Sequence, residues 1–209
     1  MASSIRNFWL QLDGPVHPAD HPVFERHRHT FNLDYPPPAF VGDVDNAPVV
    51  VLMGNGGYSP TLTPTEFARP EDTAEYIDYL RGRRQNFPSG LAPYYTASPL
   101  GPWMARGLVV QVNAVAYRSP RLSQEPINRD VAEQLPSLAA HRRWLCREVI
   151  PEARDGKRLV VAHRHGMWRL DRNPRVPNVL FSTNPVSPHL SREMMATIQQ
   201  WLGRRSVAT

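Results

Sequence analysis

The chain has 209 residues, of which 41% are hydrophobic, so it is long enough for one well-packed domain and short for two. No apolar run approaches the roughly 18 residues of a membrane span. The single cysteine, Cys146, excludes an internal disulfide framework and a four-cysteine zinc or iron–sulfur site. The first residues show no apolar stretch with a small-residue cleavage site. We therefore expect a cytoplasmic protein with no membrane partner.

The net charge is +5, and the excess comes largely from clustered arginines. These clusters are Arg81, Arg83 and Arg84; Arg142, Arg143 and Arg147; and Arg204 and Arg205. A guanidinium group is a planar fork that donates two parallel hydrogen bonds to a phosphate. The excess of basic over acidic residues is consistent with a nucleic-acid or phosphorylated partner. Arginines that complement helix C-termini explain this excess equally well.

The first 46 residues show no sustained periodicity and predict an N-terminal extension packed on one domain of residues 47–209. Four short apolar runs follow, at residues 49–53, 108–112, 159–162 and 179–182. None alternates with polar residues, which is typical of strands buried on both faces of a parallel sheet. With helical patterns between them, the runs predict a three-layer α/β/α sandwich around a central, mainly parallel four-stranded sheet.

Three longer helices are predicted between and after these strands. Proline and two acids open the first at residue 70, and arginines close it by residue 84. The second covers residues 136–149, with Cys146 on its apolar face and Pro151 as its end, so Cys146 is expected in the core. The third runs from a serine N-cap at 191 to a glycine stop at 203.

The motifs argue against nucleotide-binding loops, metal sites and a serine-hydrolase site of the common types. The loop 54–58 is no P-loop, and Ser59 stands where a dinucleotide fingerprint needs its third glycine. The pairs His27-x-His29 and His163-x-His165 lack a carboxylate at matching spacing, so we expect no metal and no cofactor. No Gly-x-Ser-x-Gly is present for a serine hydrolase. An unrelated α/β hydrolase or transferase that binds phosphate with the glycine loop stays open as a third interpretation.

An asparagine stands at or near the end of three expected strands: Asn55, Asn113 and Asn184. Parallel α/β sheets bind ligands at this end of their strands. An amide donates and accepts at once, so it can pair with the O4 and N3–H edge of uracil or thymine. Taken singly, each asparagine is better explained as a turn residue, but three together favour a shared site.

In this order, the elements resemble the uracil-DNA glycosylase superfamily over about residues 48–202. Residues 49–59 (VVVLMGNGGYS) look like the family's first motif in its asparagine version, with Met53 and Gly56 in place of a glycine and a proline. Residues 107–115 (GLVVQVNAV) are similar to the strand with the base-reading asparagine. Residues 146–162 resemble the helix, proline and strand before the last motif. Residues 181–192 (FSTNPVSPHLSR) resemble the His-Pro-Ser-Pro loop, with Asn184 for the histidine.

The resemblance implies a monofunctional DNA glycosylase that cleaves the N-glycosidic bond of uracil or a related damaged or mismatched base. The base must first leave the stack. Asn55 would orient the attacking water, and Asn184, or backbone N–H groups beside it, would donate to the anion that forms on the departing base. Asn113 would hold the base edge, in a pocket lined by Gly54, Gly57, Tyr58 and Phe67. Tyr58 and Phe67 are the candidates for stacking on the base, and the resemblance favours Phe67. Because an asparagine lacks a carboxylate's charge, slower catalysis is expected than in the aspartate-bearing branch.

The resemblance also implies contacts to single-stranded or mismatched duplex DNA, made by a monomer. Ser187, Pro188, His189 and Leu190 would contact the strand, and Arg192 would face phosphate. The alternative is a catalytically decayed nucleic-acid or nucleotide-binding protein on the same fold, which Met53, Gly56 and Asn184 favour. The sequence leaves open whether residues 87–102, with Tyr94 and Tyr95, line the site or bridge two elements.

Overall fold

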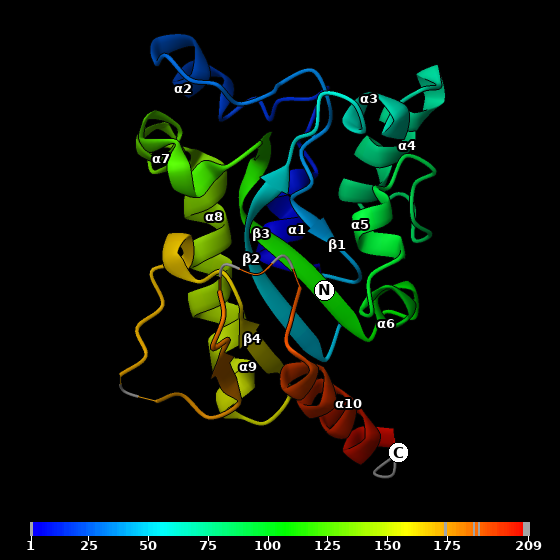
Figure 1. The fold of residues 1–209 in the computed structure, drawn as a ribbon, viewed down its shortest axis with the longest axis vertical. Helices are drawn as coiled ribbons and strands as arrows, with labels where there is room; N and C mark the ends of the chain where they lie inside the picture. The colour runs from blue at the N-terminus through cyan, green and yellow to red at the C-terminus, as the bar shows by residue number, and fades with distance from the viewer. Residues whose placement is uncertain (1, 174, 186, 188, 207–209) are drawn as a thin grey trace.

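The computed structural model describes residues 2–173, 175–185, 187 and 189–206, and Figure 1 shows the arrangement of its helices and strands. The strands are β1 (Phe40–Val41), β2 (Val49–Gly57), β3 (Val109–Ser119), β4 (Leu159–Ala162) and β5 (Val179–Phe181). The helices are α1 (Ser4–Trp9), α2 (His21–Arg26), α3 (Thr63–Glu66), α4 (Pro70–Leu80), α5 (Pro93–Thr96), α6 (Gly101–Ala105), α7 (Pro126–Ala132), α8 (Pro136–Trp144), α9 (Ile150–Arg154) and α10 (Arg192–Ser206). Within the described ranges, no helix is long and apolar enough to cross a membrane.

One five-stranded sheet organises the fold, in the order β1-β3-β2-β4-β5. The strands β3, β2, β4 and β5 run parallel, and β1 pairs antiparallel with β3. The predicted α/β/α class is therefore confirmed, with five strands instead of four. The additional strand is only two residues long, too short to show a hydrophobic pattern.

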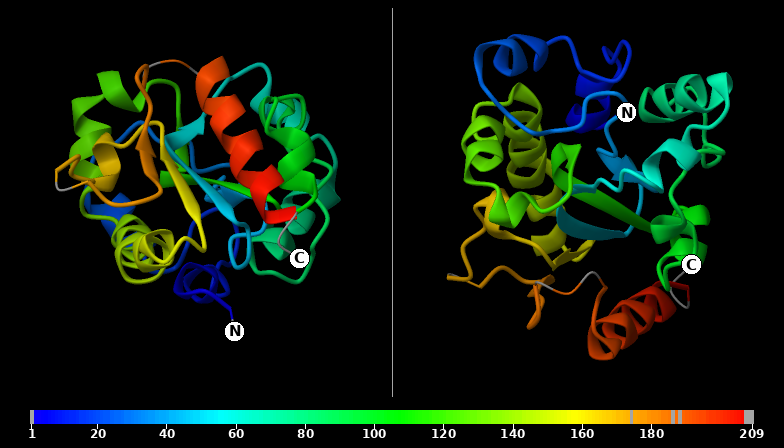
Figure 2. Two further views of the ribbon diagram at one scale, coloured as in Figure 1. Left: turned by 90° about the horizontal axis from the view of Figure 1, so that it is seen from below. Right: turned by 45° about the horizontal axis from the view of Figure 1, so that its top comes forward.

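Helices cover both faces of the sheet (Figures 1 and 2). One face carries α1, α8 and α9, and the other carries α4, α5, α6 and α10. Met53 and Gln111 line a small cavity with residues of α10 and of the segment around α5, so alternate side chains of β2 and β3 point to this second face. Every residue of β3 is buried, as expected for a strand covered on both sides.

The N-terminal helix packs into the main core through Ile5 and Trp9, which are fully buried. Trp9 Nε1 donates to His141 Nε2 at 2.8 Å, so the proton of the His141 ring lies on Nδ1. Nδ1 then donates to the backbone oxygen of Asn113, also at 2.8 Å. Burial lowers the pKa of His141 to about 4, so the ring is neutral at physiological pH. This chain of hydrogen bonds ties α1 and α8 to β3 behind Asn113.

We expect His141 to make stability depend on pH between about 4 and 6.5. The folded pKa lies below the unfolded value, so this contribution is complete above pH 6.5 and is lost as the pH falls toward 4. The slope is up to about 1.4 kcal/mol per pH unit. Urea titrations of the wild type and His141→Gln across this range measure it, and the variant should show the flatter profile. Parallel profiles would show that His141 takes up its proton equally in the folded and unfolded states, which would contradict the lowered pKa.

Two predicted helix ends differ from the structure. The helix that begins at Pro136 continues through a π-helical turn at Leu145–Val149 into α9, so Pro151 does not end it. A proline in the first turn of α9 needs no backbone donor, and the π turn before it has already shifted the hydrogen bonds. Cys146 lies in this turn and is exposed, so its expected place in the core is wrong. The last helix also passes the predicted stop at Gly203 and continues to Ser206.

Candidate functional site

Asn55 and Asn113 lie on neighbouring parallel strands, close to the carboxyl ends where α/β sheets bind ligands. Met53 pairs with Asn113 and Asn55 pairs with Val115, so the two asparagines share one face of the sheet, one diagonal step apart. Both were expected just beyond the predicted apolar runs, at or near the strand ends, but β2 and β3 stay paired up to Gly57 and Ser119. The strands therefore outlast their apolar runs, and the two amides are held by sheet backbone.

Asn55 is half-buried, and three acceptors hold its amide nitrogen. Nδ2 donates to Gly56 O at 2.8 Å, to Ser119 Oγ at 3.1 Å and to Ser119 O at 3.3 Å. Two of these are carbonyl oxygens, which only accept, so the nitrogen and not the oxygen must face them. No described residue donates a hydrogen bond to Asn55 Oδ1. This oxygen is therefore oriented by the fold and available to a water or a ligand.

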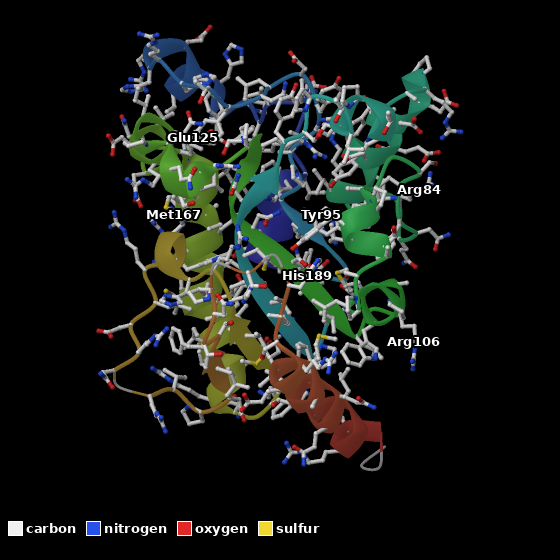
Figure 3. All side chains as sticks on the ribbon, in the orientation of Figure 1. Arg84, Tyr95, Arg106, Glu125, Met167 and His189 are labelled. Carbon is white, nitrogen blue, oxygen red and sulfur yellow. The ribbon has the colours of Figure 1, made fainter. Side chains whose placement is uncertain are left out.

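Asn113 is buried and already engaged. Its Nδ2 donates to Pro38 O at 2.6 Å and to Tyr95 Oη at 3.3 Å. Figure 3 shows Tyr95, on α5, over the middle of the sheet, and burial raises the pKa of its phenol to about 12. Tyr95 therefore lines the predicted base site, which answers the question that the sequence left open for this segment. A base edge reaches Asn113 only if Tyr95 moves.

Gly56 is required by packing against the N-terminal segment. A Cβ atom at this position would overlap Pro38 Cγ, so the proline that the glycosylase motif carries at the corresponding position has no room. A Cβ at Gly54 would make an ordinary contact with Arg164, and one at Gly57 would meet nothing. Of the two predicted pocket glycines, Gly57 therefore faces open space and Gly54 lies against Arg164, whereas Gly56 accommodates Pro38.

Phe67 lies beside the site, but its ring is covered by other side chains. Tyr35 stacks on it with a centroid distance of 5.1 Å and an interplanar angle of 24°. The Arg118 guanidinium lies 5.5 Å from the ring centroid. A base that stacks on Phe67 must therefore displace one of these two neighbours. Tyr58, the other aromatic candidate, is half-buried and forms no ring contact with the described residues.

Arg118 and Glu66 form a buried ion pair that the sequence analysis did not identify. Arg118 is 3% exposed, and its Nη2 lies 3.1 Å from Glu66 Oε2. Arg118 also donates to Gly57 O at 3.3 Å. Burial raises the pKa of Glu66, and the charge of Arg118 opposes that shift. An arginine within a strand that is otherwise almost uncharged was the available signal, because such residues are rarely buried without a specific partner. We call Asn55, Asn113, Tyr95, Arg118 and Glu66 the strand-end site.

The remaining predicted residues lie in the loop before α10 and at the start of that helix. Some of them are exposed, and others reach the sheet. Asn184 is exposed, and its only described hydrogen bond is through its backbone oxygen, which accepts from Ser187 N at 3.4 Å. Arg192 is exposed at the first position of α10. Pro188 lies outside the described residues. The structure therefore does not bring Asn184 onto the buried face that holds Asn113.

His189 and Leu190 do reach the second face of the sheet. His189 stacks on Tyr94 with a centroid distance of 5.7 Å, and Figure 3 shows it over the sheet near Tyr95. Leu190 lines a cavity of about 30 Å³ beside Met53, which has room for a water molecule but not for a base. The loop therefore packs against the sheet close to the strand-end site, without an open base pocket between them.

His163 fastens this loop to the end of β4. Its Nε2 donates to Ser187 O at 2.9 Å, which leaves Nδ1 as a buried nitrogen without a described partner. Burial lowers the pKa of the ring, so it is neutral at physiological pH. Among the residues that the structure describes, no three histidine, cysteine, aspartate or glutamate side chains gather in a way that would hold a metal ion.

The chain matches no protein-family model, no curated protein and no solved structure. Its function is therefore inferred from the residues themselves and from their geometry.

Proposed function

We propose that the chain is a DNA glycosylase-like protein that cleaves the N-glycosidic bond of uracil or a related damaged or mismatched base. One observation carries the proposal: Asn55 is anchored through its amide nitrogen at the end of β2, with Oδ1 left to accept from a water. Asn113 lies on the same face of the neighbouring strand, one diagonal step away. In this proposal, adjacent strands hold the oxygen that binds the water and the amide that reads the base.

The chemistry needs little from the chain beyond positioning. Asn55 Oδ1 accepts a hydrogen bond from the water and thereby directs the lone pair of the water oxygen at the sugar carbon. The bond from this carbon to the base breaks with its electron pair leaving on the base, the water oxygen bonds to the carbon, and the released proton passes to the departing base or to solvent. Asn113 pairs with the edge of the extruded base through its amide. Because Asn184 is exposed, donors for the departing base come from elsewhere, and Arg118 and Tyr95 are the nearest candidates within the strand-end site.

The strand-end site is closed, so a base enters only if some of its present contacts are broken. Asn113 must exchange its bond to Tyr95 for one to the base, and Phe67 must lose Tyr35 or Arg118 from its ring. Changes of side-chain rotamer are common when a protein binds its partner, and a substantial minority of complexes also rearrange a loop. Extrusion of the base is least costly from mismatched or single-stranded DNA, which favours these substrates.

A second candidate function is nucleic-acid or nucleotide binding without catalysis. It is favoured by the engagement of Asn113 with Pro38 and by the exposure of Asn184, two of the three asparagines on which the chemistry depends. In this case the clustered arginines of the chain bind the phosphate backbone, and no bond is broken.

Excision from oligonucleotides separates the two candidates. The protein is incubated with single-stranded uracil, G·U, G·T and hypoxanthine substrates, and abasic sites are then cleaved with alkali. We expect strand scission on at least one single-stranded or mismatched substrate. DNA binding that weakens with salt but gives no scission on any substrate would refute the glycosylase proposal and favour the binding protein.

A further inference from the structure

A large cleft lies at the amino ends of the parallel strands, at the other end of the sheet from the strand-end site. Its volume is about 600 Å³, which is within the usual range for small-molecule sites. Residues of α1, the turn after β1, the end of α4 and the end of α6 line it. Gly107 stands just before β3, so the cleft lies at the amino ends of the parallel strands, and we call it the amino-end cleft.

The amino-end cleft carries an excess of positive charge. Four arginines line it against two carboxylates: Arg6, Arg81, Arg84 and Arg106, with Asp43 and Asp45. Both carboxylates are committed to the chain itself. Asp45 accepts from Ser3 and Arg6, and these contacts lower its pKa despite its partial burial. Asp43 accepts from the backbone nitrogens of Asp45 and Asn46, and among the described residues the only ion pair of either acid is that of Asp45 with Arg6.

Two of the arginines remain available to a ligand. Arg106, at the end of α6, is exposed and pairs with no described residue. The nearest carboxylate to Arg81 is that of Asp13, at 3.9 Å and with a side chain that is 90% exposed, which is a weak pairing. By contrast, Arg84 is paired with Glu75 at 3.1 Å. Figure 3 shows Arg84 and Arg106 along the same side of the molecule.

The rest of the lining suits a flat organic group. Leu10 is 47% exposed and gives the cleft an apolar patch on its wall. Phe87 and Met104 add apolar surface, and the amides of Gln85 and Asn86 are exposed beside them. Guanidinium forks match phosphate oxygens, whereas the apolar wall and the amides match a ring with polar edges.

We propose that the amino-end cleft binds a phosphate ester of nucleotide size, with its phosphate between Arg81 and Arg106 and its ring against Leu10 and Phe87. The proposal is independent of glycosylase activity, because the cleft and the strand-end site lie at opposite ends of the parallel strands. A ligand at this cleft contacts α1, α4 and α6 together, so it also stabilises their packing.

Calorimetric titration with the four ribonucleoside 5′-monophosphates tests this proposal, with inorganic phosphate and the free nucleosides as separate arms. We expect at least one monophosphate to saturate and to bind at least about tenfold more tightly than phosphate or the nucleoside alone. Arg81→Gln and Arg106→Gln should each weaken it by about tenfold or more, since a charge-assisted hydrogen bond is lost.

The matched control is Arg129→Gln on α7, which removes an exposed arginine away from the cleft and should leave the affinity unchanged. Unchanged melting temperatures show that the variants remain folded. The absence of saturation by every monophosphate would overturn the proposal. Equal binding of inorganic phosphate, or affinity unaffected by both cleft variants, would overturn it as well.

Discussion

Replacing Arg118 by methionine is expected to lower the free energy of unfolding by about 3 to 5 kcal/mol, the typical cost of breaking a buried ion pair. Methionine keeps much of the volume but leaves the Glu66 carboxylate in a buried place without its counter-ion. The variant also removes the donor to Gly57 O and the cation over Phe67. Urea denaturation of the wild type and the variant, analysed with a common slope, measures the difference.

Two further variants show whether the loss comes from the unpaired charge. The double variant Arg118→Met with Glu66→Leu removes both charges and should recover much of the lost stability. Arg129→Met removes an exposed arginine and should change stability by no more than about 0.5 kcal/mol. A loss below about 1 kcal/mol for Arg118→Met would mean that the pair is open to solvent, and the strand-end site would then be less closed than described.

The sheet was predictable because its parallel strands are buried on both faces. Such strands are continuous apolar runs, and β4 was predicted at its exact residues. The predicted runs end early in β2 and β3, because Gly54, Asn55 and Asn113 are polar or small residues that the sheet holds through backbone pairing. A two-residue strand such as β1 is defined by pairing with β3 rather than by its own composition.

The site was predictable only in part, for a related reason. Sequence order placed Asn55 and Asn113 on adjacent strands, and the register puts them on one face. Whether their amides are free depends on residues distant in sequence, such as Pro38 and Tyr95, and no local pattern reports such contacts. Gly56 is a further example, because the need for glycine at this position comes from the ring of Pro38, which is distant in sequence.

Replacing Asn55 by alanine is expected to reduce the rate of base excision by about 10²- to 10³-fold, in the range for loss of a group that positions or activates the attacking water. DNA affinity should stay within about twofold, because Asn55 contacts Gly56 and Ser119 rather than a surface that faces DNA phosphates. Ser119→Ala removes one of the three anchors and should give a smaller loss of rate.

Aspartate at this position is expected to be a poor substitute, although a carboxylate carries the charge that favours catalysis. It would place an oxygen against Gly56 O and Ser119 O, where the amide nitrogen now donates. The fold thus gives a physical reason for asparagine at position 55.

Single-turnover excision by Asn55→Ala, compared with the wild type and with the exposed control Asn7→Ala on α1, is the most direct test of the strand-end site. We predict that the wild type and Asn7→Ala release the base at similar rates, and that Asn55→Ala binds the same oligonucleotide but releases almost none. Excision by Asn55→Ala at the wild-type rate would contradict the role of Asn55 and the site built around it.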